Sequence, residues 1–205
     1  MIKLYGHEIS GNVYKVRLLL ALLEVDYEYI RVDLLAGEHK QPEYLQLNPF
    51  GQVPLLVDGD LVIPDAQAIL VYIARQYSGE QWLPTESLEL SQVVRWLSTT
   101  TGEIRQGVEQ ARQFHLLGKT SVNIEVAQQK SAFILDQINR HLAEREWLEL
   151  EHPTIADIAA FPYIALASDG KVSLEPYPHI LAWIERIKNL PNFIGMKGIE
   201  TLTGV

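Results

Sequence analysis

The sequence predicts two domains, an α/β domain with the element order βαβ–ββα and an all-α domain that follows it. One observation is a change of hydrophobic period near Pro64, from about two residues, typical of a strand, to about 3.6, typical of a helix. Another is the pair Asp58-Gly59 between two apolar runs, a strong hairpin signal. Beyond residue 88 the periodicity is helical. We therefore expect an α/β domain at 1–78, a linker at 79–88 and a helical domain at 89–205.

The α/β domain is expected to begin with a strand at 2–5 and a polar loop that leads into a helix. This helix has one apolar stripe, formed by Val13, Val16, Leu19, Leu20 and Leu23. A second strand follows at 27–32, where β-branched and aromatic residues are frequent. Strand, helix, strand, long loop, hairpin and helix is the order of a thioredoxin-like domain.

The hairpin is expected to consist of strands at 53–57 and 61–63. Pro64 and Asp65 then start a helix, since proline is favoured in the first helical turn. The expected apolar stripe of this helix is formed by Ala68, Ile69, Tyr72 and Ile73.

The second half contains only helical patterns. The segment SGEQWLPTESL, which begins at Ser78, loses periodicity and collects glycine, proline and serine, which indicates a linker. Three later helices are expected around apolar positions: Val93, Trp96 and Leu97; Ala127, Ser131, Ile134, Ile138, His141 and Leu142; Ile180, Ile184 and Ile187. Thr154 and Asp157 form a capping box, so we interpret Asp157 as a structural residue.

Composition excludes several classes of function. Apolar and charged fractions of 47% and 21% are ordinary for a globular protein, and a net charge of −9 without a basic cluster argues against nucleic acid as a partner. The longest apolar run, Leu18 to Leu23, is too short to span a bilayer, so we expect no membrane partner and a cytoplasmic location. His115 and His152 lack a partner at metal-ligand spacing, so no metal is expected.

The absence of cysteine excludes disulfides, thiolate metal sites and a redox pair, although the order of elements is thioredoxin-like. If this protein performs sulfur chemistry, the sulfur must arrive with a ligand.

Two local features indicate a peptide-binding site. Pro54 lies at the mouth of a strand, where a cis Val53-Pro54 bond would turn the backbone of Val53 outward to pair with an extended peptide. The helix that begins at Asp65 offers unpaired N–H groups, which favour a carboxylate. A peptide with a carboxylate at one end would fit both features.

The same stretch, NPFGQVPLLVDGDLVIPDAQAI, resembles the glutathione-binding half of the soluble glutathione S-transferase family. SGNVYKVRLLLALLE resembles the first helix of its serine-type classes, and GEHKQPEYLQLNPFGQVP is similar to the phi and theta classes. Thr154-Ile155-Ala156-Asp157 matches the family's capping box in the second domain. The resemblance implies a cytoplasmic, homodimeric detoxification enzyme that conjugates glutathione, as co-substrate, to a small hydrophobic electrophile.

By this resemblance Ser10 is the catalytic residue whose hydroxyl donates a hydrogen bond to the sulfur of glutathione. Lowering the pKa of a thiol from about 8.5 to roughly 6.5 requires about 2.7 kcal/mol. A hydrogen bond to a charged group supplies roughly 1.5–3 kcal/mol and a helix N-terminus about 0.3–1. Ser10 could instead only cap the helix. Asn12 and Tyr5 are alternative donors to the sulfur, and Asn12 matches a disulfide-reducing class.

The resemblance also implies the residues that hold glutathione: His39, Lys40, Gln52, Val53, Pro54, Asp65 and Ala66. His39 and Lys40 would contact the carboxylate of its glycine, and Gln52 and Val53 its cysteinyl backbone. Asp65 and Ala66 depart from the usual glutamate and serine at the γ-glutamyl end. Because Ala66 has no hydroxyl, we expect weaker binding of glutathione.

The electrophile is expected on the helical domain near Thr100, Glu103, Ile104 and Gly107. Phe50 resembles an aromatic anchor that some classes insert into the partner subunit, or it packs within its own domain. Two alternatives to the transferase remain open. One is a glutathione-dependent disulfide reductase that uses Asn12 or Ser10, and the other is a non-catalytic interaction module on the same fold.

Overall fold

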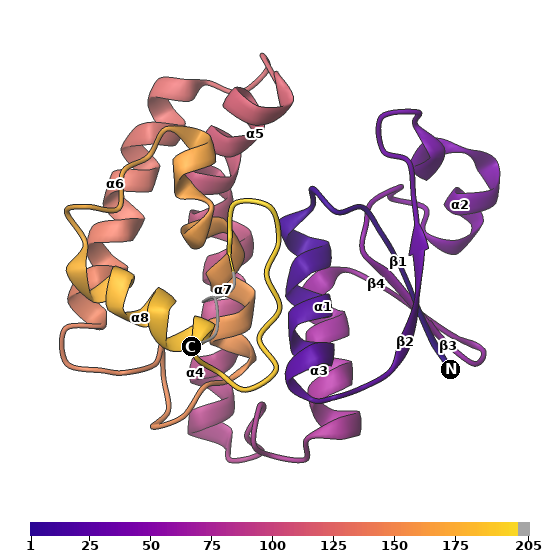
Figure 1. Ribbon diagram of the computed structural model, residues 1–205, viewed down its shortest axis with the longest axis horizontal. Coiled ribbons are helices and arrows are strands. Elements are labelled where there is room, and N and C mark those ends of the chain that lie inside the picture. Colours follow the sequence, from indigo (N-terminus) through magenta and orange to yellow (C-terminus); the bar gives the residue numbers. More distant parts are fainter. Residues whose placement is uncertain (201–205) are drawn as a thin grey trace.

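The α/β domain and the helical domain lie side by side in the computed structural model, which describes residues 1–200 (Figure 1). The strands are β1 (Ile2–Gly6), β2 (Tyr27–Arg31), β3 (Leu55–Asp58) and β4 (Leu61–Pro64). They form one sheet of order β2-β1-β3-β4, in which β1 and β2 are parallel and the other neighbours antiparallel. The βαβ–ββα prediction is confirmed.

The two faces of the sheet have different partners because side chains alternate along a strand. Leu4 and Leu56 face helices α1 (Gly11–Leu22) and α3 (Ala66–Tyr77), which separate the sheet from the helical domain (Figure 1). Tyr5 and Leu55 point to the opposite face and pack with Tyr44 of the short helix α2 (Pro42–Leu47). Tyr5 therefore lies on the face away from the helical domain.

Helix α3 begins two residues later than expected. Pro64 is the last residue of β4, and Asp65 is the N-cap of α3. The buried stripe consists of Ala66, Ile69, Leu70, Ile73 and Ala74. The prediction that Ala68 belongs to this stripe is wrong: Ala68 is exposed, because spacings of three and four residues counted from Ala66 do not include it.

The helical domain begins with one long continuous helix, made of α4 (Ser87–Thr99), the π-helical segment η2 (Thr100–Glu109) and α5 (Gln110–Leu117). The remaining helices are α6 (Ile124–His141), α7 (Ile155–Ala165) and α8 (Pro178–Lys188), with the short 3-10 helices η1 (Glu38–Lys40) and η3 (Ala167–Gly170). The predicted end of this domain, residues 201–205, lies outside the described residues.

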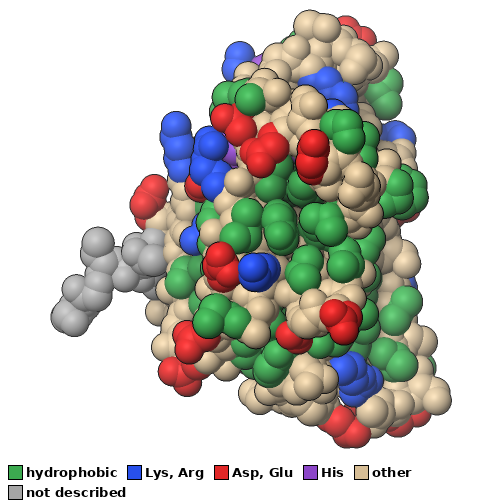
Figure 2. All heavy atoms as spheres, turned by 90° about the vertical axis from the view of Figure 1, so that its right-hand side faces the viewer, with side chains coloured by type: hydrophobic (Ala, Val, Ile, Leu, Met, Phe, Trp, Pro, Cys, Tyr) green, Lys and Arg blue, Asp and Glu red, His purple; other side chains and the backbone are tan. Residues whose placement is uncertain are grey.

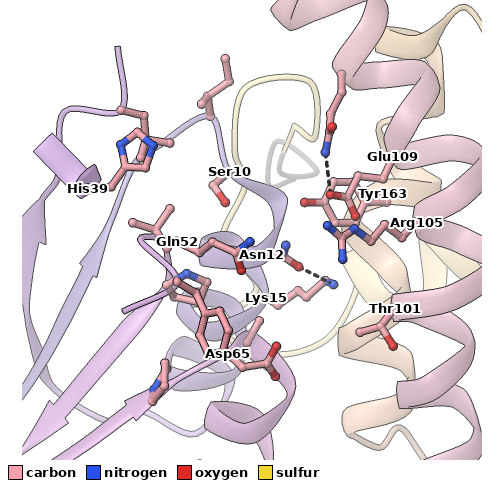
Figure 3. A pocket seen from close by; sticks show the side chains of 18 of the residues that line it. Ser10, Asn12, Lys15, His39, Gln52, Asp65, Thr101, Arg105, Glu109 and Tyr163 are labelled. Carbon is pink, nitrogen blue, oxygen red and sulfur yellow. Dashed lines mark hydrogen bonds between the residues drawn. The ribbon is translucent and has the colours of Figure 1, made fainter. Parts of the chain in front are cut away.

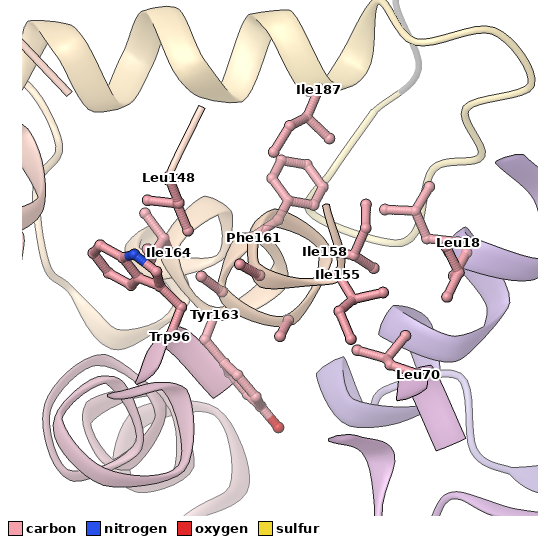
Figure 4. Packing of buried hydrophobic residues seen from close by; sticks show 14 of the residues in the cluster. Leu18, Leu70, Trp96, Leu148, Ile155, Ile158, Phe161, Tyr163, Ile164 and Ile187 are labelled. Carbon is pink, nitrogen blue, oxygen red and sulfur yellow. The ribbon is translucent and has the colours of Figure 1, made fainter. Parts of the chain in front are cut away.

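Helix α7 is buried from Ile155 to Ile164 and joins the cores of the two domains. Figure 4 shows Phe161 and Ile158 of α7 among side chains from α1, α3, α4 and α8. The segment between α3 and α4 also packs into this core, because Trp82 and Leu83 are buried and the carbonyl of Trp82 accepts a hydrogen bond from the Ile155 N–H at 2.9 Å. The domains therefore share one hydrophobic core.

The predicted capping box at the start of α7 is confirmed. Thr154 Oγ1 accepts a hydrogen bond from the Ala156 N–H, and Asp157 Oδ2 accepts one from the Thr154 N–H at 2.9 Å. Asp157 Oδ1 additionally accepts from the Leu148 N–H at 3.0 Å and from Trp183 Nε1 at 2.9 Å. Burial raises the pKa of Asp157 despite these donors.

No helix within residues 1–200 combines the length and the apolar character that a membrane span requires.

Candidate active site at the domain interface

A cleft of about 580 Å³ separates the loops at one end of the sheet from η2, α5 and α7 (Figure 3). The residues that were predicted to bind or activate glutathione line it, with the exception of Tyr5: Ser10, Asn12, His39, Lys40, Gln52, Val53, Pro54, Asp65 and Ala66. Tyr5 does not line it, since its side chain points to the other face of the sheet. The structure therefore brings together segments that lie up to 56 positions apart in the sequence, from Ser10 to Ala66.

Ser10 is the N-cap of α1, and its Oγ accepts a hydrogen bond from the Val13 N–H at 3.3 Å. A hydroxyl group has one donor as well as its acceptor lone pairs. The cap uses the acceptor only, and the O–H of Ser10 makes no hydrogen bond within residues 1–200. Capping the helix and donating to a sulfur atom are therefore compatible roles for this side chain.

Asn12 is held by Lys15, a residue that the sequence analysis did not single out. Lys15 Nζ donates a hydrogen bond of 2.8 Å to Asn12 Oδ1 (Figure 3). Because an ammonium group cannot accept, the contact identifies the oxygen of the amide, and Asn12 Nδ2 is the atom left to donate. Lys15 is 1% exposed and lies 4.9 Å from the centre of the Tyr163 ring. Burial lowers its pKa to about 8.

The loop before Pro54 carries the backbone that could pair with a peptide. The Val53-Pro54 bond is cis, as predicted, and β3 begins only at Leu55. The carbonyl of Gln52 accepts hydrogen bonds from the Tyr44 hydroxyl at 2.7 Å and from Asn48 Nδ2 at 2.8 Å. These bonds leave the backbone of Val53 at the wall of the cleft.

Lys40 and His39 belong to η1 and lie beside this loop. Lys40 Nζ donates to the carbonyls of Phe50 and Gly51, at 3.1 and 2.7 Å. Its ammonium group thus supports the loop as well as bordering the cleft. Nδ1 of His39 is buried without a partner within residues 1–200, and burial followed by the charge of Lys40 lowers the pKa of His39.

Asp65 and Ala66 border the cleft at the N-terminus of α3. Asp65 Oδ1 accepts hydrogen bonds from the Gln67 and Ala68 N–H groups, at 2.9 and 3.1 Å. The carboxylate therefore occupies part of the helix N-terminus that was expected to be open to a ligand. Asp65 Oδ2 and the N–H of Ala66 keep no partner in the described chain and can meet an amino group and a carboxylate respectively.

The helical wall differs from the prediction. Thr100 borders the cleft, but Ile104 and Gly107 are buried in the helical domain and Glu103 does not line the cleft. The residues that line it from η2 and α5 instead include Thr101, Arg105, Glu109, Arg112 and Gln113. Because a π-helix bonds residue i to i+5, its winding is wider than that of the α-helix we assumed, which rotates a different face toward the cleft.

Two polar links organise this wall. Arg112 is buried, and its Nε donates to Asp169 Oδ2 at 2.9 Å while its Nη1 donates to the carbonyl of Ile9 at 3.1 Å. Glu109 Oε1 accepts from Gln113 Nε2 at 2.9 Å, and burial raises the pKa of Glu109 against the opposing charge of Lys15. Four-residue spacing of polar residues from Thr101 to Gln113 was a signal for this face in the sequence.

Comparison with known proteins agrees with this architecture. Residues 1–75 match the family described as glutathione S-transferase, N-terminal domain, and residues 119–191 match glutathione S-transferase, C-terminal domain. Glutathione S-transferase 3 of Zea mays is 35% identical over 203 residues, which cover 94% of this chain and 91% of that protein.

Solved structures extend the similarity to three dimensions. A glutathione S-transferase from Pseudomonas fluorescens Pf-5 superposes with a TM-score of 0.90 at 32% identity, over 95% of this chain and 98% of that one. A possible glutathione S-transferase from Rhodopseudomonas palustris gives a TM-score of 0.89 at 31% identity, over 95% and 97% of the two chains. Both domains and their arrangement are thus shared with these proteins.

Proposed function

This chain belongs to the glutathione S-transferase family and is a glutathione-conjugating enzyme, and from that premise we propose that Ser10 activates the thiol. The observation that carries the proposal is the unused O–H of Ser10 at the N-terminus of α1, in the same cleft as the cis-proline loop. Assignment to a serine-type, phi-like or theta-like class is part of this proposal, as is a cytoplasmic location. Within residues 1–200 no cluster of His, Asp and Glu could hold a metal ion.

Glutathione would lie extended along the loop that contains Pro54, between η1 and the N-terminus of α3. Its glycine carboxylate would meet Lys40 and His39, and its cysteinyl backbone would pair with Val53. Its γ-glutamyl group would meet Asp65 Oδ2 through the amino group and the Ala66 N–H through the carboxylate. With these contacts the sulfur would lie beside Ser10 and Asn12.

In the reaction the thiol loses its proton to solvent, and the thiolate attacks an electrophilic carbon. A carbon–sulfur bond forms, and either a leaving group departs with its electron pair or a double bond is saturated. The hydroxyl of Ser10 and the N-terminus of α1 supply roughly 1.5–3 and 0.3–1 kcal/mol toward the thiolate, enough to lower its pKa by about two units. The nucleophile belongs to the co-substrate, and the protein supplies orientation and electrostatics.

The test is the ultraviolet absorbance of bound glutathione thiolate against pH in the wild type, Ser10→Ala and Asn12→Ala. We expect the bound thiol to titrate below its free value and only Ser10→Ala to restore that value. If Asn12→Ala restores it instead, Asn12 is the activator, and the free Nδ2 of Asn12 makes a disulfide reductase the better assignment. If no thiolate forms at any pH, the protein is a binding module.

The family forms dimers, and we assign the interface here to the outer face of the α/β domain. Figure 2 shows apolar side chains gathered on this side of the molecule. Phe50 is 74% exposed, and Leu61 and Val62 are exposed on β4, which is an edge strand of the sheet. An uncovered edge with apolar side chains is a natural surface for association.

Sedimentation of Phe50→Ala tests this assignment. We expect the variant to shift toward monomer, because an aromatic anchor contributes much of the energy of an interface. Leu181→Ala, which truncates an exposed side chain on α8, is the control and should remain dimeric. A Phe50→Ala dimer of unchanged stability would reject the role of Phe50.

A further inference from the structure

The basic side chains that line the cleft from the helical domain are Arg105, Arg112 and Lys119. Arg112 is neutralised by Asp169, and Lys119 Nζ donates to Gln113 Oε1 at 2.9 Å. The side chain of Arg105 forms no ion pair or hydrogen bond within residues 1–200. Figure 3 shows its guanidinium group turned into the cleft, on the side opposite Asn12. The Arg105 guanidinium therefore keeps its hydrogen-bond donors free for whatever fills the cleft.

Glu109 is the acidic side chain nearest to Arg105 along this helical face, but it has other partners. Gln113 Nε2 donates to its carboxylate, and among charged groups Lys15 acts on it more strongly than Arg105 does. No nitrogen of Arg105 lies within 4.0 Å of a carboxylate oxygen in the described chain. Arg105 thus influences Glu109 through its charge but forms no ion pair with it in the described chain.

The remaining side chains of this wall are also polar. From the helical domain only Leu117 among the lining residues is aliphatic, while Thr101, Gln113 and Tyr163 present hydroxyl or amide groups. An apolar electrophile would leave these groups and the Arg105 guanidinium facing hydrocarbon, which is unfavourable for each of them. A substrate with its own anionic group would satisfy Arg105.

Glutathione does not account for Arg105. In the proposed function both carboxylates of glutathione bind to the α/β domain, one beside Lys40 and His39 and the other at the N-terminus of α3. Arg105 lies on the opposite wall, which faces the second substrate. This argument rests on the proposed function, because it uses the orientation of glutathione proposed above.

We propose that Arg105 is a specificity-determining residue that binds a carboxylate on the electrophilic substrate, so that this enzyme prefers acidic electrophiles to neutral ones of the same reactivity. A guanidinium group matches a carboxylate with two parallel hydrogen bonds. The anionic group stays unchanged in the reaction. At the reacting carbon of an aryl chloride, the carbon–sulfur bond forms and chloride leaves with its electron pair.

The test uses a matched pair of electrophiles, 4-chloro-3,5-dinitrobenzoate and its methyl ester, which share the reacting carbon and differ in charge. We expect Arg105→Met to lower the acid-to-ester ratio of kcat/KM by roughly 10- to 100-fold, the factor typical of losing a hydrogen bond to a charged group. Arg105→Lys should recover part of the ratio. Arg145→Met, which removes an exposed positive charge just after α6, controls for net charge and should leave the ratio unchanged.

An acid-to-ester ratio of kcat/KM that stays unchanged in Arg105→Met would overturn the proposal, whether or not both values fall. Equal losses with a raised KM for glutathione would assign Arg105 to glutathione instead. If the wild type turns over neither electrophile, these two aryl chlorides lie outside its substrate range. In that event calorimetric binding of the acid and ester conjugates of glutathione still decides the role of Arg105: the proposal requires tighter binding of the acid conjugate, and loss of that preference in Arg105→Met.

Discussion

Lys15 is the most deeply buried charged side chain of the cleft, and its replacement by methionine gives a quantitative prediction. Burial lowers the pKa of Lys15 from its ordinary value of 10.5 to about 8, against the opposing influence of Glu109 and Asp65. Lys15→Met keeps an unbranched side chain of similar length and removes the charge. The variant therefore removes both the cost of burying an ammonium group and its hydrogen bond to Asn12.

The magnitude follows from the shift of the pKa. At about 1.36 kcal/mol per unit, a fall from 10.5 to about 8 corresponds to about 3 kcal/mol. Between these values the unfolded chain binds the proton more tightly than the folded protein, so the stability of the wild type rises with pH across this window. The full cost is present below about pH 8 and is lost above 10.5. Lys15→Met lacks this dependence.

The assay is urea unfolding, followed by tryptophan fluorescence from pH 7 to about pH 10.5. We expect the free energy of unfolding of Lys15→Met, relative to the wild type, to fall by about 3 kcal/mol over this range. The lost hydrogen bond to Asn12 shifts the comparison by a nearly constant amount and does not change its slope. Lys15→Arg is the control, because a guanidinium group stays charged throughout and should track Lys15→Met.

A difference between Lys15→Met and the wild type that stays flat from pH 7 to about pH 10.5 would refute the reasoning. It would mean that water solvates the ammonium group despite its 1% exposure. Because Lys15 also acts on Glu109, the same comparison in a Glu109→Gln background shows whether the slope belongs to Lys15 itself.

Two further predictions concern Asp157 and Ala66. Asp157→Ala should lower the free energy of unfolding by about 3–5 kcal/mol, because it leaves two backbone N–H groups and an indole N–H unpaired in the core. A loss below about 1 kcal/mol, measured by thermal unfolding, would contradict the capping role. Ala66→Ser should tighten the binding of glutathione roughly 10- to 100-fold, since it supplies a hydroxyl donor to the γ-glutamyl carboxylate. An unchanged affinity, measured by isothermal titration calorimetry, would show that the missing hydroxyl does not matter.

The parts of the fold that could be predicted are those with local chemical causes. The Asp58-Gly59 signal marks the hairpin between β3 and β4, although the turn itself is Gly59-Asp60, because Asp58 still pairs with Leu61. Gly59 has a φ of +60° that other residues adopt reluctantly. The same holds for the capping box of Thr154 and Asp157, whose spacing alone defines its hydrogen bonds. The residues of the α/β half of the cleft were found differently, through the resemblance of the motifs around Pro54 and Ser10 to the glutathione S-transferase family.

The helical half of the cleft was assigned to the wrong residues, although the four-residue spacing of its polar residues was a signal for it. The π-helical winding of η2 depends on how this segment packs, as at Gly107, where a Cβ atom would lie 2.7 Å from the backbone nitrogen of Ser131 on α6. A periodic pattern assumes an α-helix, so it selected Ile104 where Arg105 faces the cleft. Lys15 was overlooked for a related reason, since it lies in an apolar helix and its partner Tyr163 comes from the other domain.

The position of Ser10 depends on both domains at once. The carbonyl of Ile9, the residue before Ser10, accepts a hydrogen bond from Arg112, which belongs to α5 and is itself held by Asp169 of η3. On the other side of Ser10, a Cβ atom at Gly11 would lie 3.0 Å from the Tyr163 ring, so a larger residue there would require the ring to shift by a few tenths of an ångström. The residues on either side of Ser10 thus both contact the helical domain, Ile9 through Arg112 and Gly11 through Tyr163. Because the shared core holds that interface together, the helical domain takes part in positioning Ser10 as well as in facing the second substrate.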